Sequence, residues 1–289
     1  MKISKILTQN GKRISIEVFP PKTDSSFESV RSATEEIASL APSFMSVTYG
    51  AGGGTSKYTL EIAKNIMEKY SVPSLAHLTC VSSTRETVRS RIEDMKTAGI
   101  KNVMALRGDI PRDMDSCPRD YQYAYQLVEE LRHSDGDFCI GGACYPEGHP
   151  ESGSAKDDII NLKHKVDSGL DFLTTQMFFD NSLFYNFVDK ATSAGISLPI
   201  VPGIMPITSV TQIDRVVALS GSYMPKEFLL LVERYEHDPI SMKQAGIQYA
   251  IEQIDDLFRN TVNNVHLYSM NKPEVARAIL SAFSGDLVK

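Results

Sequence analysis

RISIEVFPPK (residues 13–22) is the stretch of sequence that decides the fold. Ile14, Ile16 and Val18 recur with a period of two, which predicts a β-strand. Glu17 interrupts this apolar series with a carboxylate. Because successive side chains of a strand point to opposite faces, the apolar residues share one face and Glu17 lies on the other. The strand therefore needs one face for a core and another that can accommodate a charge.

The same type of strand recurs along the chain. Amphipathic helical patterns alternate with these strands, and 222–262 has room for more than one helix. The strand-like runs are 13–20, 43–51, 73–80, 102–109, 138–146, 171–179, 199–207 and 264–270. Eight strands that alternate with helices predict a parallel (β/α)8 TIM barrel with extra helices before the last strand. We expect one catalytic domain over residues 1–289 and no regulatory domain.

A doubly wound open sheet is the competing fold, and GAGGGT at 50–55 is the stretch that favours it. This stretch lies between a strand and a helix, as a dinucleotide-binding loop would. It lacks the third glycine of the G-x-G-x-x-G pattern, so that fingerprint is not present. We interpret it as a loop between a strand and the next helix of a barrel.

Polar residues collect on one face of several predicted strands, toward their carboxyl ends. In a barrel one face of each strand packs on the helices and the other fills the interior. Besides Glu17, the polar residues are Ser46 and Thr48, His77 and Thr79, Arg107 and Asp109, and Thr174 and Gln176. Barrel active sites lie at the carboxyl ends of the strands. Glu17 is therefore expected to point into the mouth of the barrel.

Composition and charge exclude several classes of protein. The net charge is −6 with acids and bases interspersed, so no basic patch suggests nucleic-acid binding. No apolar run approaches the ~20 residues of a membrane span, and the first fifteen residues are too polar for a signal peptide. The four cysteines, Cys80, Cys117, Cys139 and Cys144, form no C-x-x-C pair. We expect reduced thiols and a cytoplasmic protein.

Glu17 has two interpretations. A carboxyl group screened from water has a raised pKa and can act as a general acid near neutrality. Alternatively, Glu17 is a structural acid that pairs with Arg107. Asp109 in ALRGDIP (105–111) ends a strand and is placed to face a ligand.

Other polar residues predict ligand contacts, although not a metal site. Tyr145 and His149 in YPEGHPE (145–151) suit stacking on, or hydrogen bonding to, a flat cofactor. Gln176 in the interior needs partners and can recognise a heterocycle through both its donor and its acceptor. The first strand ends in EVFPP, without the H-x-H expected of a metal-dependent barrel hydrolase, and no histidine pair has the i, i+4 spacing of helical ligands.

Nine motifs taken together resemble the methylenetetrahydrofolate reductase family, in its bacterial catalytic-domain form. They follow one another in family order from residue 14 to about 272. They are SIEVFPPK, FMSVTYGAGG, AHLTC, ALRGDIP, YPEGHPE, NLKHKVDSG, TTQMFFD, PIVPGIMPI and LYSMNK. The resemblance implies a (β/α)8 flavoprotein that reduces 5,10-methylenetetrahydrofolate to 5-methyltetrahydrofolate. It implies FAD as cofactor and NAD(P)H as co-substrate, with NADH favoured, in a ping-pong hydride transfer through the flavin.

The resemblance also implies roles for individual residues. Glu17 would protonate the folate as its five-membered ring opens, and Asp109 would contact the pterin and tune the flavin. Folate or nicotinamide contacts would come from Thr48, Asp109, Gln176, Gln212 and Lys272. FAD contacts would come from Thr48, Tyr49, Ala51, His77, Arg107, Gly108, Asp109, Ala124, Tyr145, His149, Asp158, Asn161, His164 and Lys165.

The chain departs from the family pattern at three positions. His164 stands where an arginine is usual near the flavin phosphates, Val216 stands where a phenylalanine contacts ligand, and Lys272 replaces an arginine. Lysine keeps the charge of arginine and loses its bidentate fork. We expect a homo-oligomer. The alternatives are a metal-dependent barrel hydrolase and a non-catalytic folate- or flavin-binding subunit.

Overall fold

The computed structural model describes residues 1–21, 23–49, 56–110, 118 and 120–288, without the side chains of 56–57, 215 and 218–220. The predicted loop at 50–55, Ala51 and Cys117 lie outside these residues. None of the helices in this part of the chain is long and apolar enough to cross a membrane.

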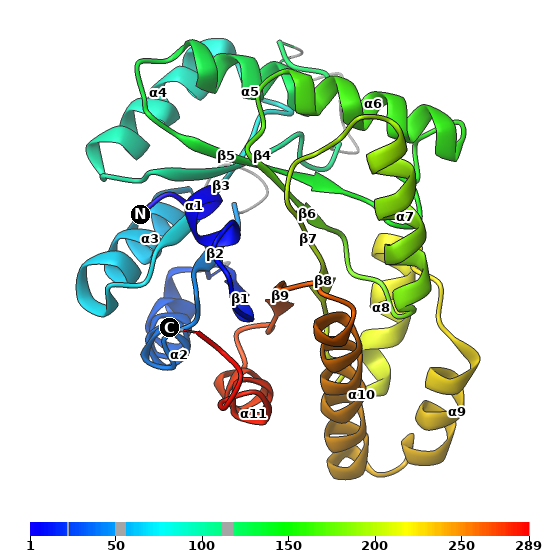
Figure 1. Cartoon of the computed structure of the whole chain (residues 1–289). Helices are drawn as coiled ribbons and strands as arrows, with labels where there is room; N and C mark the ends of the chain where they lie inside the picture. The colour runs from blue at the N-terminus through cyan, green and yellow to red at the C-terminus, as the bar shows by residue number, and fades with distance from the viewer. Residues whose placement is uncertain (22, 50–55, 111–117, 119, 289) are drawn as a thin grey trace.

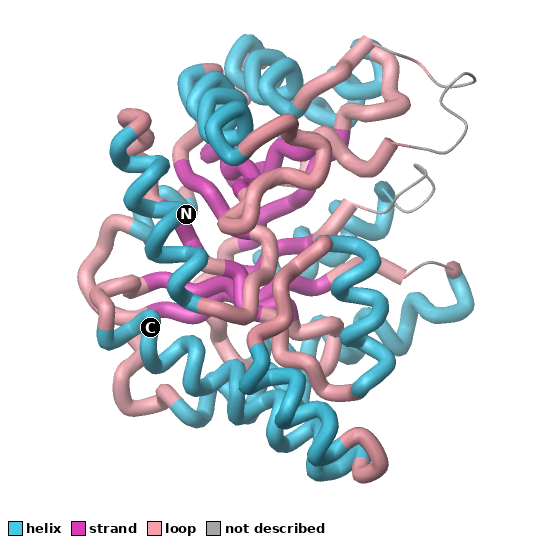
Figure 2. Tube along the Cα trace, turned by 90° about the vertical axis from the view of Figure 1, so that its right-hand side faces the viewer, coloured by secondary structure: helices cyan, strands magenta, loops and turns pink. Residues whose placement is uncertain are grey.

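All strands of the described chain are parallel and form one sheet that curves into a barrel, with helices around it (Figures 1 and 2). The strands are β1 (Arg13–Val18), β2 (Met45–Val47), β3 (Ser74–Thr79), β4 (Asn102–Leu106), β5 (Cys139–Cys144), β6 (Phe172–Thr175), β7 (Ile200–Val201), β8 (Gly203–Ile204) and β9 (Asn264–Tyr268). The helices are α1 (Ile3–Leu7), α2 (Phe27–Ser39), α3 (Ser56–Tyr70), α4 (Arg85–Thr97), α5 (Ala124–His133), α6 (Ala155–Asp167), α7 (Asn181–Ser193), α8 (Val210–Ser220), α9 (Lys226–Tyr235), α10 (Pro239–Arg259) and α11 (Pro273–Ala282). A 3₁₀ turn, Asp24–Ser26, precedes α2. The (β/α)8 prediction is confirmed, as are the extra helices, α9 and α10, before the last strand.

The seventh predicted strand, 199–207, is shorter than expected and divided in two. β7 pairs with β6, whereas β8 pairs with β9 on the other side. Pro202 separates the two halves, because proline has no N–H to donate to a neighbouring strand. Its carbonyl oxygen still accepts a bond of 2.8 Å from the backbone N–H of His266. The barrel thus closes through one interrupted strand, whose first half pairs with β6 and whose second half pairs with β9.

Strand alternation places apolar side chains of the strands in two clusters, as the sequence predicts, and a third cluster lies at α8, α9 and α10. The larger cluster lies between the sheet and the helices and includes Ile14, Ile16 and Val18. The second fills the amino-terminal end of the barrel interior, where Ile3, Ile6 and Leu7 of α1 close the end of the barrel. Its other buried members are Phe44, Leu75, Met104, Cys139, Phe172 and Val201. Polar residues are therefore left to occupy the interior at the carboxyl ends of the strands.

Two helix ends show why glycine follows them. Gly99 after α4 and Gly195 after α7 have φ angles of 72° and 79°. This left-handed conformation is available to glycine at little steric cost, so each glycine ends its helix and directs the chain toward the next strand.

Glu35 on α2 joins this helix to α3. Its carboxylate accepts hydrogen bonds from Lys69 Nζ at 2.8 Å, Asn65 Nδ2 at 3.0 Å, Tyr70 Oη at 3.1 Å and Arg31 Nε at 3.2 Å. Lys69 makes the largest contribution, and together these donors lower the pKa of Glu35 to about 2. Because the folded pKa lies below the ordinary value, this stabilisation is complete above about pH 4.5 and disappears as the pH falls toward 2.

Glu35→Gln is expected to lower the free energy of unfolding by about 1 kcal/mol at pH 7, since solvent screens charges near the surface. The difference from the unmodified protein should shrink below pH 4, which urea titrations at pH 7 and pH 3 would measure. Glu36→Gln is the matched control, because the neighbouring Glu36 makes an exposed ion pair with Arg277. An equal loss for Glu35→Gln at both pH values would contradict this account.

Candidate active site

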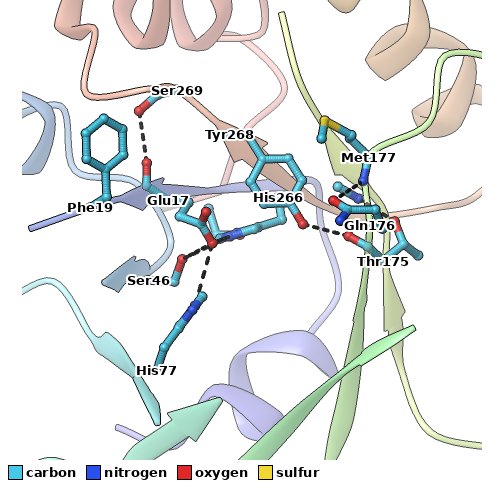
Figure 3. A network of polar contacts seen from close by, with 12 residues as sticks. Glu17, Phe19, Ser46, His77, Thr175, Gln176, Met177, His266, Tyr268 and Ser269 are labelled. Carbon is cyan, nitrogen blue, oxygen red and sulfur yellow. Dashed lines mark hydrogen bonds and ion pairs between the residues drawn. The ribbon is translucent and has the colours of Figure 1, made fainter. Parts of the chain in front are cut away.

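Glu17 lies at the carboxyl end of β1, beside Ser46 of β2 and Tyr268 of β9. The sheet register places these three residues side by side. Their side chains share the interior face, as the alternation predicts, and meet at the mouth of the barrel (Figure 3). The side chain of Glu17 remains 21% exposed. The carboxyl group is therefore held by protein on one side and is accessible on the other.

A chain of short polar contacts runs from Glu17 into the barrel interior. Ser46 Oγ donates to Glu17 Oε2 at 3.2 Å and lies 3.1 Å from Nε2 of His266. Nδ1 of His266 lies 2.7 Å from Ser15 Oγ. A second imidazole, that of His77, approaches Glu17 Oε2 to 3.6 Å through its Nε2. That distance exceeds a hydrogen bond, and no described residue forms one with this buried nitrogen.

The predicted rise in the pKa of Glu17 is wrong for this arrangement. Burial acts to raise that pKa, but the contact with His266, the positive charges of His77 and His266, and the Ser46 hydroxyl together hold it below its ordinary value. Burial also lowers the pKa of His77, despite the opposing effect of the Glu17 charge. The groups around Glu17 thus favour its carboxylate form.

The alternative partner of Glu17, Arg107, pairs elsewhere. The Arg107 guanidinium binds Glu151 through two bonds, NH1 to Oε2 at 2.6 Å and NH2 to Oε1 at 2.7 Å. β4 ends at Leu106, and Gly108 has a φ of 87°. Strand alternation therefore stops before Arg107, and Asp109 lies exposed beyond the strand. A structural pair of Glu17 with Arg107 is excluded by this geometry.

Most of the expected flavin contacts lie on neighbouring elements, β2 to β5 with α5 and α6. The rings of Tyr145 and His149 meet edge to face at 4.6 Å, and His164 lies 4.4 Å from the Tyr125 ring. Lys165 Nζ donates to the carbonyl oxygen of Ala143 at 2.5 Å. The remaining expected contacts, by element, are Thr48 and Tyr49 after β2, Ala124 at the start of α5, and Asp158 and Asn161 on α6.

Electrostatics in this region favour an anionic ligand. Burial lowers the pKa of Lys165 and raises that of Tyr145 to about 12. Burial disfavours the charged form of Lys165 even though the charge of Asp158 acts in the opposite direction. A phosphate would add a charge-assisted partner for this ammonium group. Arg107 already holds a planar carboxylate, which shows that its guanidinium is oriented to bind an oxyanion.

The expected substrate contacts fall into two groups. Gln212 Oε1 accepts from the Thr208 backbone N–H and hydroxyl, both at 2.8 Å, and Lys272 Nζ donates to the same hydroxyl at 2.6 Å. The structure thus brings Gln212 and Lys272 together through Thr208. Gln176 lies on the other side of Tyr268 from Glu17 (Figure 3), and its Oε1 accepts from the Met177 N–H at 3.0 Å.

Apolar residues near the expected ligand contacts belong to the core. Phe178 and Phe179, in the motif TTQMFFD, are both buried. Val216 is 4% exposed and belongs to the cluster between α8, α9 and α10, which also contains Phe228 and Met242.

His266 and Tyr268 are the site residues that the sequence analysis missed. They alternate with the apolar Val265 and Leu267 in NVHLY, the same pattern as in the first strand. Applied to the last strand, the alternation would have placed both side chains in the interior. The Tyr268 hydroxyl donates to the Thr175 carbonyl oxygen at 2.6 Å, and burial raises its pKa well above the ordinary value.

A metal site and a second cavity are the alternatives to this cluster within the part of the chain that the structure describes. Among the described residues no group of three or more His, Cys, Asp or Glu side chains could hold a metal ion. A cavity of about 660 Å³ lies at the opposite end of the barrel, near Leu7, Val201 and Asn264. Its described lining offers Tyr185 and Asp189 as titratable groups, and it contains none of the expected site residues.

Comparisons with known proteins find related chains over nearly the whole sequence. The family described as methylenetetrahydrofolate reductase matches residues 2–284. The chain is 37% identical to 5,10-methylenetetrahydrofolate reductase of Pectobacterium carotovorum over 94% of this chain and 90% of that protein. It is 35% identical to the Escherichia coli protein of the same name, with the same coverage. Methylenetetrahydrofolate reductase (NADH) 1 of Arabidopsis thaliana is 34% identical over 96% of this chain and 49% of the plant protein.

A solved structure shares the fold at low sequence identity. It is an uncharacterized protein from Clostridium thermocellum that binds two copies of 5-methyl-5,6,7,8-tetrahydrofolic acid, with a TM-score of 0.63, 15% identity and 98% coverage of both chains. The fold, the matched span and the identities to curated relatives lead to one conclusion: the chain belongs to the methylenetetrahydrofolate reductase family, a family of oxidoreductases.

Proposed function

We propose that the chain reduces 5,10-methylenetetrahydrofolate to 5-methyltetrahydrofolate with NAD(P)H, in a ping-pong reaction through FAD, with Glu17 as the general acid. The observation that carries this proposal is the placement of Glu17, supported from inside the barrel and accessible at its mouth. Family membership supports the substrate. The name of the plant relative, which includes NADH, supports NADH as the favoured donor.

The residues present fit FAD. His77 offers a buried Nε2 without a partner among the described residues, Lys165 offers a buried ammonium group, and Arg107 is oriented for an oxyanion. Tyr145 and His149 add flat surfaces at the same end of the barrel. A bound FAD would carry the electron pair from the nicotinamide to the folate. Lys165 and Arg107 would hold its phosphates, and His77 would contact it beside Glu17.

Glu17 performs the proton transfer in this proposal. Its carboxyl group gives a proton to the folate nitrogen that departs when the five-membered ring opens, and it is left as a carboxylate. Ser46 fixes the carboxyl oxygen, because its hydroxyl donates to Oε2. The following loop is also held, since Asn271 bonds both the N–H and the carbonyl oxygen of Phe19, at 3.0 and 2.9 Å. The acid therefore keeps its position while substrates exchange.

Polar groups around the mouth orient the substrates. Gln176 has an amide to match the donor and acceptor edges of a pterin or a nicotinamide. Lys272 supplies a positive charge toward the folate, and its contact with Thr208 links it to Gln212. Asp109 is exposed beyond β4, close enough to Arg107 and Tyr145 to affect their pKa values. It thus lies beside the residues proposed to bind the flavin.

The test is a flavin titration followed by two half-reactions. The purified protein should bind FAD and absorb near ~450 nm, because the cofactor carries the redox chemistry. NADH should bleach the absorption without oxygen, and 5,10-methylenetetrahydrofolate should restore it with formation of 5-methyltetrahydrofolate. A hydrolase would bind no flavin, and a non-catalytic subunit would bind flavin that NADH leaves oxidised. Either result would refute the proposal.

A further inference from the structure

We propose that His266 stores the proton that Glu17 delivers, and that the Ser46 hydroxyl passes it between them when substrate covers the mouth of the barrel. The inference rests on the proposed role of Glu17 as the acid. It adds a second residue that carries the proton. This residue lies on β9, whereas Glu17 lies on β1.

The contacts form a continuous path. His266 is 1% exposed, and both of its ring nitrogens lie near a serine hydroxyl. Nε2 is 3.1 Å from Ser46 Oγ, which is 3.2 Å from Glu17 Oε2, and Nδ1 is 2.7 Å from Ser15 Oγ. The direct distance between His266 Nε2 and Glu17 Oε2 is 3.8 Å. A proton therefore needs the serine as a bridge, and Figure 3 shows Ser46 beside both groups.

The ionisable groups around His266 decide which imidazole serves as the store. Glu17 faces it from β1, His77 from β3, and the Tyr268 ring lies 5.4 Å away on its own strand. The ring of Phe44 stacks on the imidazole, with the ring centroids 5.7 Å apart. His77 has no hydroxyl bridge among the described residues, and burial lowers its pKa. His266, which contacts Ser46, is therefore better placed than His77 to store the proton.

Binding of substrate over the mouth of the barrel changes the relative proton affinities of Glu17 and His266. Before substrate binds, water reaches Glu17, and the surrounding groups hold the pKa of its carboxyl group low. In this proposal the proton then resides on His266. A substrate over Glu17 removes that water, which favours the neutral carboxyl group. His266 is already buried, so its surroundings change much less. The balance between the two groups shifts toward protonated Glu17 as the substrate requires an acid.

The transfer is balanced in protons and charge. The imidazolium gives its Nε2 proton to Ser46 Oγ, while the Ser46 hydroxyl proton passes to Glu17 Oε2. A neutral imidazole, an unchanged serine and a neutral carboxyl group remain. When the mouth opens again, Glu17 takes a proton from water and the path refills in reverse.

Ser46→Ala tests the bridge, with Ser15→Ala as the matched control on the far side of the same imidazole. Stopped-flow absorbance would follow each half-reaction of the FAD-loaded enzyme at pH 6 and pH 8. Proton transfer by a positioned group is worth ~10²–10⁴-fold, so Ser46→Ala should slow the folate step at least about tenfold at pH 8. The deficit should shrink at pH 6, because protons from water become a hundred times more abundant. Ser15→Ala should slow that step much less.

A second variant, His266→Asn, removes the store and keeps a polar group near Ser15. It should show the same pH-dependent loss, with flavin binding and the NADH step as measures of correct folding. If both variants slow the folate step equally at pH 6 and pH 8, or do not slow it, His266 does not store the proton. If Glu17→Gln itself left the folate step intact, the proposed acid would fail instead. The two hypotheses are therefore separated.

Discussion

Glu17→Gln is expected to slow the folate half-reaction by ~10²–10⁴-fold, the usual worth of general acid–base catalysis, while NADH still bleaches the flavin at close to its normal rate. Only opening of the folate ring needs a proton from the protein. The amide keeps the size of the carboxyl group and can still accept from the Ser46 hydroxyl. Stopped-flow absorbance would resolve the two steps in one preparation.

Glu147→Gln is the matched control for this result. Glu147 lies on the loop after β5 and accepts a bond of 2.8 Å from the backbone N–H of Tyr223, which a glutamine oxygen can also accept. Both half-reactions should remain near normal in this variant. Equal slowing of both steps by Glu17→Gln would indicate a structural role, because removing one partner of a buried pair costs roughly 3–5 kcal/mol. Normal folate reduction would also exclude Glu17 as the acid.

Phe172→Ala is expected to cost about 3–5 kcal/mol of unfolding free energy, the range for a buried phenylalanine. Phe172 is fully buried in the cluster closed by α1, where it packs with Phe44 and Met104. Its ring fills the space next to Gly141, where an added Cβ would lie 2.5 Å from it. The alanine variant would therefore leave a cavity in the barrel interior, near its amino-terminal end.

Urea unfolding would measure this loss, and Phe172→Leu is the control because it keeps most of the apolar volume. The leucine variant should lose less than half as much. Phe172 lies on the interior face near the amino-terminal end, so the folded variant should keep its NADH half-reaction. A loss below about 1 kcal/mol for alanine would mean that the neighbouring residues close the cavity.

Local sequence patterns predicted the strand faces well, because alternation depends only on residues within one strand. Ile14, Ile16 and Val18 pack outward and Glu17 points inward, as expected. The prediction failed for Arg107, where Gly108 with its positive φ ends the alternation. Pro202 is visible in the sequence, yet which neighbour each half of its strand would join depends on the closed barrel.

The electrostatics of Glu17 could not be predicted from its own strand. Burial alone argues for a raised pKa, and that was the expectation. The groups that lower it, His266, His77 and Ser46, come from three other strands. Only the register between strands brings them within 4 Å of the carboxylate, so the direction of the shift is a property of the assembled barrel.

The contacts around His266 also have a consequence for how the molecule folds. His266 is 251 residues from Ser15 and 220 residues from Ser46 along the chain. Contacts of such separation carry a large entropic cost of closing the chain between them. Pairing of β9 with β1 places the imidazole beside Glu17. The polar surroundings of the Glu17 carboxylate are therefore complete only in the closed barrel.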